Sequence, residues 1–429
     1  MVRFYYELTR FRVVFGKLRF VPEFLTLLPP PVALDQLLAH LTAAPASEIV
    51  PTQDSLERIT FFPITAPHPL PEFPRSTVDG YAVRAKDTHG ASESLPAYLR
   101  LVGEVPMGGS AKIPLRPTEC LLIHTGGMLP EGADAVVMVE NTQDITDEIE
   151  IFRAAAMGEN VILAGEDVRT GEEVVPAGII LRPAEIGGLM ALGITTVRVA
   201  RRPRVGILSS GDEVVPPDVS TQPGQVRDVN TYTLRALITQ AGGDPIPYGI
   251  IPDNLDAFRA AARRALDECD AVVFTAGSSV SVRDLTAQTI RELGQPGVLV
   301  HGVNVRPGKP TILAVCDGKA VIGLPGNPVS ALVIAQIFVV PVIERLLGMA
   351  TTRPRSAVPA RLALNLSSQA GREDWVPVKL VSKLDGVWAE PVFGKSNLIF
   401  TLARADGLIR IPADANGLAA GEGVEVVLL

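Results

Sequence analysis

Three short loops in the middle of the sequence combine glycine, asparagine and small hydroxyl residues, which let phosphate oxygens approach the backbone. They span residues 209–213, 277–281 and 325–330, and each follows an apolar run. In an open parallel sheet, the loops after the strands face the ligand crevice, and the amides of a following helix can hold an anion. One such loop alone is an ordinary strand-to-helix turn, but three in one segment favour phosphate binding.

The side chains in and near these loops suit an anionic substrate. The loop residues that we expect to bind it are Ser278, Ser279, Pro325, Gly326, Asn327 and Ser330. Asn327 stands where a helix N-cap belongs and Pro328 where the first helical residue belongs, so a helix with free amides is predicted to begin there. Arg306 and Lys309, in the motif RPGKP, add two cations ahead of that loop.

Three carboxylates lie near the predicted strand ends, at Glu213, Asp253 and Asp284. Phosphates and acidic side chains repel each other unless a hard metal ion lies between them. The combination therefore indicates a divalent cation, bound by these acids beside the phosphate-binding loops.

The elements that position these loops belong to a long and mildly acidic chain. Its 429 residues predict about three domains. The 39 basic and 47 acidic residues give a net charge of -8 without a long basic block, which disfavours a nucleic-acid partner. The three cysteines lie far apart and form no CxxC motif, which suits a reducing cytoplasm and indicates no cysteine metal cage.

No membrane span is predicted. The longest apolar run, residues 329–343, contains Gln336 and Pro341 and falls short of the ~20 residues that a bilayer needs, so it is interpreted as a buried helix. Residues 1–20 carry five basic residues among six aromatics and lack the apolar core of a secretion signal. They fit a packed extension, a weak membrane-surface element, or translation from a start codon placed too early.

Apolar runs alternate with helical patterns in the centre of the chain. Strands are predicted near 205–208, 247–251, 271–274 and 320–324, with helices over 231–241, 255–266 and 282–293. Such alternation is typical of a parallel sheet covered on both faces. Apolar periodicity and helix-end signals predict further helices over 33–41, 53–59 and 183–193.

Two other parts of the chain are interpreted as β structure. Residues 98–151 contain short apolar segments separated by glycine and proline, which indicates a small β domain. Residues 353–429 contain alternating segments and no convincing helix, which indicates a barrel or a sandwich. In the small β domain, His124 is interpreted as a satisfied packing residue rather than a metal ligand.

A series of motifs over residues 33–429 resembles the molybdopterin molybdotransferase (MoeA) family, to which the C-terminal domain of gephyrin is related. The motifs are, in order, STVDGYAVR, IHTGGMLPEGADAVVMVE, GEDVR, PAEIGGLMALG, SSGDEV, TAGSSVSVRD, RPGKPT, GLPGNPVSA and GRED. A chance match of so many motifs in one order is not expected.

The resemblance implies the last step of molybdenum cofactor synthesis. In that step adenylylated molybdopterin is bound, its pyrophosphate link is cleaved with Mg²⁺, molybdate is placed on the dithiolene, and AMP is released. The family further implies a cytoplasmic, elongated homodimer, in which the β domain of one subunit reaches over the α/β domain of the other. The resemblance also allows for contact with a molybdopterin adenylyltransferase and with molybdoenzyme maturation factors.

The expected fold class is a multidomain α/β plus β protein. Its centre is a doubly wound, parallel-sheet molybdopterin-binding domain, joined to a small β domain, a helical and extended linker domain and a C-terminal β barrel. The expected bounds are 1–31 for an N-terminal extension, 32–66 with 168–201 for the discontinuous linker domain, 67–167 for the small β domain, 202–348 for the α/β domain and 349–429 for the barrel.

Site residues follow from the resemblance, motif by motif. The expected catalytic residues are Asp79 in DGYAVR, Thr125 in HTGG, Asp167 in GEDVR, Glu213 in SGDE, Asp253 in IPDN and Asp284 in VSVRD. Asp253, Asp284 and Glu213 are the expected Mg²⁺ ligands. Lys309, Arg372 in GRED and Ser396 in GKSN match substrate-binding positions, as does Arg306, where one cation replaces another.

The chain departs from the family pattern at two places near the site. The loop GSSVSVRD is one residue shorter than the GGVSVGxxDY of many members, which bears on the alignment of Asp284. A basic residue expected four positions before Arg306 is Gly302, with His301 beside it. This change weakens the anion clamp or moves its charge to His301.

Two other functions fit the same motifs. A non-catalytic molybdopterin-binding scaffold of gephyrin type would suit the altered GSS loop, but a scaffold has no reason to keep five acids together. The second alternative is the adenylylating partner enzyme, whose domain resembles the α/β segment and whose reaction requires ATP.

Overall fold

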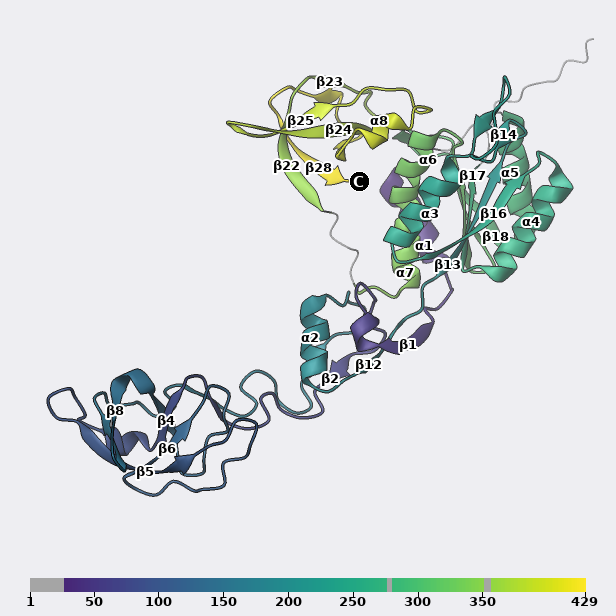
Figure 1. The fold of residues 1–429 in the computed structure, drawn as a ribbon. Coiled ribbons are helices and arrows are strands. Elements are labelled where there is room, and N and C mark those ends of the chain that lie inside the picture. The colour runs from purple at the N-terminus through teal and green to yellow at the C-terminus, as the bar shows by residue number, and fades with distance from the viewer. Residues whose placement is uncertain (1–26, 276–279, 351–355) are drawn as a thin grey trace, which may run out of the picture.

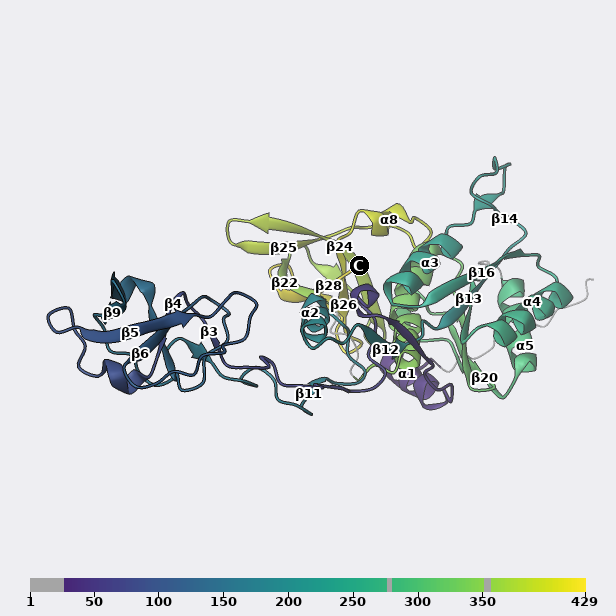
Figure 2. The ribbon, with the colours of Figure 1, turned by 60° about the horizontal axis from the view of Figure 1, so that its bottom comes forward.

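A computed structural model of the chain describes residues 27–275, 280–350 and 356–429, with the backbone alone at 280–284. The molecule is elongated (Figure 1). A small β domain lies at one end, a helical and extended segment lies in the middle, and an α/β domain lies beside a β barrel at the other end. The turned view keeps this arrangement (Figure 2).

The α/β domain is built on a six-stranded sheet. Its strand order is β16 (Asp244–Ile251), β13 (Arg204–Ser210), β17 (Ala271–Thr275), β21 (Lys319–Leu324), β20 (Ile312–Cys316) and β18 (Pro296–His301). The first four strands are parallel, as expected, whereas β20 runs antiparallel to both of its neighbours, β21 and β18. The turn between β20 and β21 explains the reversal, because Asp317 and Gly318 both have positive φ, as a two-residue hairpin turn requires.

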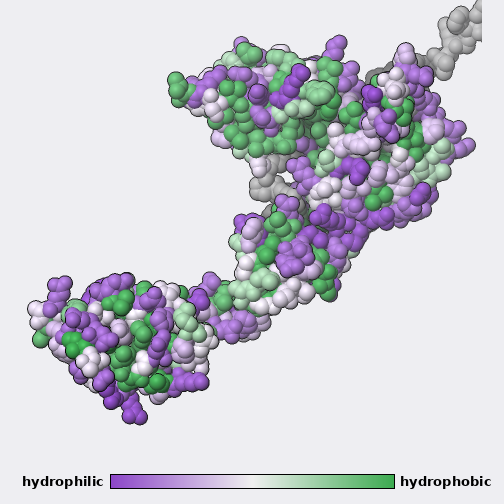
Figure 3. Space-filling model, in the orientation of Figure 1, coloured by the Kyte–Doolittle hydropathy of each residue, from purple (hydrophilic) through white to green (hydrophobic). Residues whose placement is uncertain are grey.

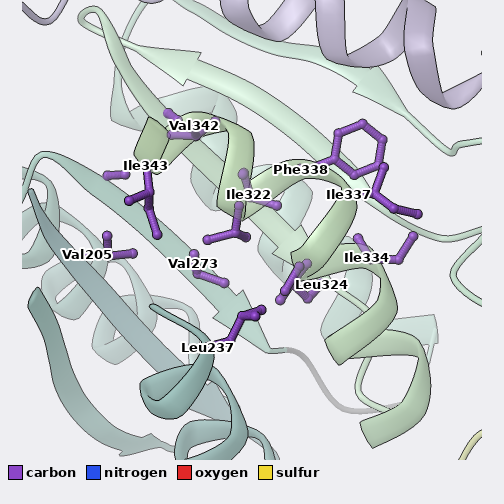
Figure 4. Packing of buried hydrophobic residues seen from close by; sticks show 14 of the residues in the cluster. Val205, Leu237, Val273, Ile322, Leu324, Ile334, Ile337, Phe338, Val342 and Ile343 are labelled. Atoms are coloured by element: carbon purple, nitrogen blue, oxygen red, sulfur yellow. The ribbon is translucent and has the colours of Figure 1, made fainter. Parts of the chain in front are cut away.

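Helices cover both faces of this sheet, which confirms the doubly wound arrangement. Helix α3 (Asn230–Gln240) shares one core with the long C-terminal helix, while α4 (Leu255–Glu268) and α5 (Val280–Leu293) cover the other face. Successive residues of a strand point to opposite faces. Accordingly Val273 joins the first core, and Phe274 joins the second. Figure 4 shows Val273 and Ile322 of the sheet pointing toward Leu237 and Ile343.

The long C-terminal helix consists of α6 (Pro328–Ile334), a π-helical segment η4 (Ala335–Val339) and α7 (Val340–Leu346). Pro341 accounts for the irregular segment, since proline has no amide to donate to the preceding turn. The helix is long and apolar enough to cross a membrane, but 78% of its most apolar stretch is buried inside the protein. The expectation of a buried helix is therefore confirmed.

The small β domain contains a six-stranded sheet. Its order is β7 (Ala135–Met138), β4 (Gly80–Val83), β6 (Glu119–Ile123), β5 (Ala97–Glu104), β9 (Glu148–Ile151) and β8 (Thr142–Ile145). The Asp79-Gly80 pair resembles a simple turn in sequence, yet Gly80 has a different role. A Cβ atom there would collide with the carbonyl of Val137, so glycine is required for the close approach of β4 and β7.

The middle segment pairs strands that are distant in sequence. Strand β1 (Ser47–Pro51) pairs with β12 (Thr196–Ala200), and β2 (Ile64–Thr65) pairs with β11 (Glu173–Val175). A further pair of this kind, β3 (Arg75–Ser76) with β10 (Val161–Ile162), lies in the small β domain (Figure 2). Helix α2 (Pro183–Ala191) forms as expected.

Two of the predicted helices in the N-terminal part need correction. The helix expected over 53–59 is wrong, because only a 3-10 turn, η1 (Thr52–Asp54), forms before Ile59 and Thr60 pair with Ile180 and Val199. Helix α1 (Pro30–Ala39) does form, but Ala33 and Leu37 are buried in the core of the α/β domain rather than in the middle segment.

The C-terminal domain is a closed barrel. Strands β24 (Glu373–Lys383), β25 (Gly386–Pro391), β22 (Ala357–Leu362), β28 (Gly423–Leu428) and β26 (Gly407–Ile411) form the ring, which β24 and β26 close by pairing. A short helix, α8 (Phe400–Ala403), interrupts the predicted all-β pattern. The barrel face visible in Figure 3 has more hydrophobic residues than the neighbouring face of the α/β domain.

One element of the α/β domain belongs to the barrel. Strand β19 (Val305–Arg306) pairs in parallel with the start of β24, so that Arg306 lies opposite Asp374, while Val305 remains buried in the core of the α/β domain. The pairing of β19 with β24 thus joins the backbones of the two domains next to Arg306 and Lys309.

Candidate active site

A large cleft lies between loops of the α/β domain and the barrel. Its volume is about 1130 Å³, and its walls come from segments 305–310, 325–330, 365–377 and 392–401. Seven residues predicted from the sequence line it: Arg306, Lys309, Pro325, Asn327, Ser330, Arg372 and Ser396. These residues are scattered over 90 positions of the chain. The fold therefore brings most of the expected substrate-binding set to one surface.

The cleft is rich in positive charge. Arg306, Lys309, Arg372 and Lys395 line it, and Asp374 is the one carboxylate among the described lining residues. Such a set favours an anion, because guanidinium and ammonium groups form strong charge-assisted hydrogen bonds with oxyanions.

The RPGKP loop depends on glycine at its centre. Gly308 has φ +118°, and a Cβ atom there would collide with the side chain of Ile334 in α6. Thr311 Oγ1 donates a hydrogen bond of 2.6 Å to the Gly308 carbonyl and fixes the same turn. Because Lys309 follows directly, this turn sets the direction of its side chain.

We expect Gly308→Ala to lower the free energy of unfolding by about 1–3 kcal/mol, since overpacking and backbone strain act together. Anion binding in the cleft should weaken as well. Gly421→Ala is the matched control, because Gly421 also has a positive φ but open space around it. Thermal unfolding of the two variants measures the difference, and equal losses would mean that the contact with Ile334 has no effect.

Direct hydrogen bonds join the two sides of the cleft. Asn327 Nδ2 donates to Ser396 Oγ over 3.0 Å, and the amide of Val329 donates to the Ser396 carbonyl over 3.0 Å. Asn327 is the N-cap of α6, as expected, but its side chain makes this contact across the cleft and does not cap the helix.

A second, smaller cavity adjoins the cleft. It measures about 360 Å³ and shares Asn327 and Asn397 with the larger one. Its lining includes Ser209, Ser210, Glu213, Asp228, Asn230, Thr275 and Gly326. Ser278 and Ser279, which follow Thr275 in sequence, lie outside the described residues.

Several polar groups around the second cavity have no partner among the residues that the structure describes. Asn230 Nδ2 donates to the Gly326 carbonyl over 2.8 Å, but Asn230 Oδ1 and Ser210 Oγ are buried and accept or donate nothing within the described part of the chain. A buried polar atom without a partner is costly. These atoms are therefore suited to hydrogen bonds with a ligand.

Acidic residues gather beside the second cavity. The amide of Asp253 donates to Asp212 Oδ1 over 3.2 Å, while Asp253 Oδ1 is buried without a partner in the described residues. Burial raises the pKa of Asp253, and the nearby charges of Asp212 and Glu213 raise it further. The side chain of Asp284, at the start of α5, lies outside the described residues. Among the side chains that are described, no three of His, Cys, Asp or Glu form a metal-binding group.

Asp79 and Thr125 form a compact unit in the small β domain. Asp79 Oδ1 accepts hydrogen bonds from the Thr125 amide at 2.7 Å and from Thr125 Oγ1 at 3.1 Å. These bonds, the amide first, lower the pKa of Asp79. His124 lies between two acids, with 2.9 Å from Nε2 to Glu104 Oε1 and 3.8 Å from Nδ1 to Asp79 Oδ1. His124 thus has polar partners, and it is partly exposed rather than packed in a core.

The acids of the small β domain do not meet the cleft within one chain. Figure 1 shows β4 and β6, which flank Asp79 and Thr125, at the opposite end of the molecule from the α/β domain. Asp167 is exposed, and its amide donates to the Leu70 carbonyl over 3.1 Å in a turn. As the described residues define them, the two cavities include none of these three residues in their linings.

The structure adds residues that sequence reasoning missed. They are Asp212, Asn230, Asp374, Lys395 and Asn397. Asp374 stands two positions after Arg372, but as an acid it does not signal an anion site in the sequence. Lys395 and Asn397 flank Ser396, but no periodicity marks them.

Comparisons with known proteins agree over most of the chain. Residues 28–193 match the MoeA N-terminal region (domain I and II), residues 206–345 match the probable molybdopterin binding domain, and residues 359–429 match the MoeA C-terminal region (domain IV). The molybdopterin molybdenumtransferase of Nostoc sp. is 35% identical over 402 residues, which are 92% of this chain and 91% of that protein. The enzyme of the same name from Bacillus subtilis is 32% identical, over 93% and 94% of the two chains.

A solved structure shows the same fold. The molybdopterin biosynthesis MoeA protein from Pyrococcus horikoshii OT3 superposes with a TM-score of 0.83 and 31% identity, over 94% of this chain and 100% of that one.

Proposed function

The chain belongs to the MoeA family and is a molybdopterin molybdenumtransferase of molybdenum cofactor biosynthesis, and on that premise we propose how it acts. It binds adenylylated molybdopterin, cleaves the pyrophosphate link in the presence of Mg²⁺, transfers molybdate to the dithiolene and releases AMP. The observation that carries this proposal is the cationic cleft that opens onto a second polar cavity bordered by acids.

Molybdate is assigned to the larger cleft. A tetrahedral oxyanion needs N–H donors and positive charge and is repelled by carboxylates. Arg306, Lys309 and Arg372 meet that need, with Ser330 and Ser396 as hydroxyl donors. Apart from Asp374, the acids near the site lie on the side of the second cavity, so the two cavities differ in the ligand that they favour.

The diphosphate of the substrate is assigned to the second cavity. Ser210 and Asn230 have hydrogen-bonding atoms there that no described residue uses, and the loop that contains Ser278 and Ser279 follows Thr275 in sequence. With the molybdate in the adjoining cleft, the dithiolene would lie near Asn327 and Asn397, which border both cavities.

The acids of this side fit a divalent cation. Asp253 Oδ1 is buried without a partner among the described residues, and Asp253 is repelled by Asp212 and Glu213. A hard cation would bind this oxygen of Asp253 and would neutralise the repulsion between the three acids. Asp253 and Glu213, together with Asp284, would hold Mg²⁺, which usually takes one or two carboxylates and completes its shell with water and substrate phosphates. When bound, the ion neutralises charge on the phosphate oxygens during cleavage.

A second subunit would complete the site. Asp79 and Thr125 lie too far from the cleft to act on it within one chain, yet they form a hydrogen-bonded unit that is exposed to solvent. In a two-fold homodimer, the small β domain of one subunit can cover the α/β domain of the other. Asp79, Asp167 and Thr125 would then orient the substrate or the attacking oxygen.

Product analysis tests the proposed reaction. The purified protein is mixed with adenylylated molybdopterin, molybdate and Mg²⁺, or with ATP and molybdopterin, and AMP is quantified. We expect AMP only in the first mixture and only with Mg²⁺. Adenylylated molybdopterin and pyrophosphate, measured alongside AMP, would indicate the adenylylating activity if they form in the second mixture. Binding without any of these products in either mixture would indicate a scaffold.

A further inference from the structure

The carboxylate of Asp374 stands out because it lies in the wall of a cleft that favours anions. Asp374 is only 3% exposed, and it is the single acid among the described residues of the lining. A negative charge beside an anion site opposes binding on Coulomb grounds. The repulsion between Asp374 and a bound anion therefore has to be offset by a favourable effect of Asp374 on the site.

The partners of Asp374 indicate that role. Arg372 Nε donates to Asp374 Oδ1 over 2.7 Å, and Arg372 Nη2 donates to Oδ2 over 3.1 Å, which is a two-pronged pairing. Arg306 Nη1 lies 3.7 Å from the same Oδ2. Such pairing fixes the plane of a guanidinium group, which otherwise rotates on a long side chain.

The backbone supports the same geometry from both sides of the cleft. Arg372 directly precedes β24, and Asp374 is the second residue of that strand, so the two side chains meet at the start of the strand. Arg306 lies opposite Asp374 in the β19–β24 pair. A buried carboxylate thus connects one arginine of the α/β domain with one arginine of the barrel.

We propose that Asp374 is the positioning residue of the oxyanion site, holding Arg372 and Arg306 in the orientation in which their remaining N–H groups bind a tetrahedral dianion. This inference rests on the proposed function, because it takes the larger cleft as the molybdate site. It adds a residue that acts through the arginines and does not itself touch the oxyanion.

The direction of one substitution separates positioning from simple electrostatics. Asp374→Asn removes a negative charge, so electrostatics alone predicts tighter molybdate binding. Positioning predicts weaker binding, by about tenfold, because the arginines lose their fixed orientation. Isothermal titration of the full-length protein with sodium molybdate at constant ionic strength shows whether the substitution raises or lowers the molybdate Kd.

Glu373→Gln is the matched control. Glu373 is the neighbouring buried carboxylate of β24, and it accepts from Trp375 Nε1 over 2.8 Å and lies 3.5 Å from Arg410 Nη1. Among the described residues it does not line the cleft. It should change thermal stability without changing the molybdate Kd. A loss of affinity equal to that of Asp374→Asn would mean that any buried charge of β24 has this effect, and would overturn the inference.

A double-mutant cycle with Arg372→Ala tests whether Asp374 affects molybdate affinity through Arg372. If Asp374 acts through Arg372, the loss caused by Asp374→Asn should shrink from about tenfold to about threefold or less when Arg372 is absent. If Asp374→Asn does not fold, Arg372→Lys takes its place, because lysine keeps the charge but cannot form the fork. That variant should also lose about tenfold in affinity, and unchanged affinity would overturn the inference.

The outcomes distinguish this inference from the function on which it rests. If the unmodified protein binds no molybdate, the proposed oxyanion site itself is wrong. If the unmodified protein binds molybdate and Asp374→Asn binds it equally or more tightly, the positioning role is wrong and the site stands.

Discussion

Asp253→Asn should reduce the rate of AMP release by about a hundred- to a thousandfold, the loss expected when a key electrostatic contact to a reacting group is removed. The same substitution should raise the thermal stability of the protein without Mg²⁺. Its carboxylate is buried at Oδ1 without a partner in the described part of the chain, and its pKa is raised by burial and by neighbouring acids. Removing the charge of Asp253 therefore removes an unfavourable burial and repulsion, which the bound cation would otherwise offset.

The pH dependence has a definite sign. Because the pKa of Asp253 is raised in the folded protein, the folded state holds this proton more tightly than the unfolded chain does. The protonated group favours folding at pH values below the ordinary value of 3.8, and this contribution is lost as the pH rises through the raised pKa. The stability advantage of Asp253→Asn should hence grow over that interval and stay constant above it.

Calorimetry at several pH values, with and without Mg²⁺, measures both effects. Asp256→Asn is the control, since Asp256 is an exposed acid in the first turn of α4, three positions further on. It should leave AMP release unchanged. An Asp253→Asn protein that releases AMP at the normal rate would remove Asp253 from the reaction.

Two inactive variants should restore activity when they are mixed as subunits. Asp79→Asn impairs the small β domain, and Asp253→Asn impairs the α/β domain. If each active site takes one domain from each subunit of a two-fold dimer, a mixed dimer holds one intact site and one doubly impaired site. Random mixing makes half of the dimers mixed, so activity should recover to about a quarter of normal.

A second mixture controls for this recovery. Asp253→Asn and Glu213→Gln both impair the α/β domain, so their mixed dimers contain no intact site and should remain inactive. The subunits need to be exchanged by co-expression or by reversible unfolding, and AMP release is measured against each variant alone. No recovery with the Asp79→Asn pair, in dimers shown to be mixed, would place the whole site within one chain.

Local sequence signals predict much of this fold, and the exceptions have physical causes. The apolar run at 271–274 and the loop residues after it locate the central strand, because buried parallel strands are apolar on both faces. The Asp317-Gly318 turn, with positive φ at both residues, shows why β20 and β21 form an antiparallel hairpin that alternation alone does not predict. The expected helix at 53–59 fails because tertiary pairing of Ile59 and Thr60 overrides its local preference.

The candidate site was predictable where residue type carried the signal. Arg306, Lys309 and Arg372 are cations in recognisable motifs, and they meet in one cleft. Asp374 was missed because an acid is not expected in an anion site, and only its two-pronged contact with Arg372 reveals its role. The relation of Asp79 to the cleft could not be predicted either, since it depends on how two chains associate.

Strand β19 has a mechanical consequence. Two residues of the α/β domain are built into the barrel wall, and the second of them is Arg306. If the barrel rotated relative to the α/β domain, Arg306 would move together with β24, because β19 is paired with that strand. The relative orientation of the two domains and the position of Arg306 at the proposed oxyanion site are therefore coupled. An oxyanion bound by Arg306 should restrain movement between the domains.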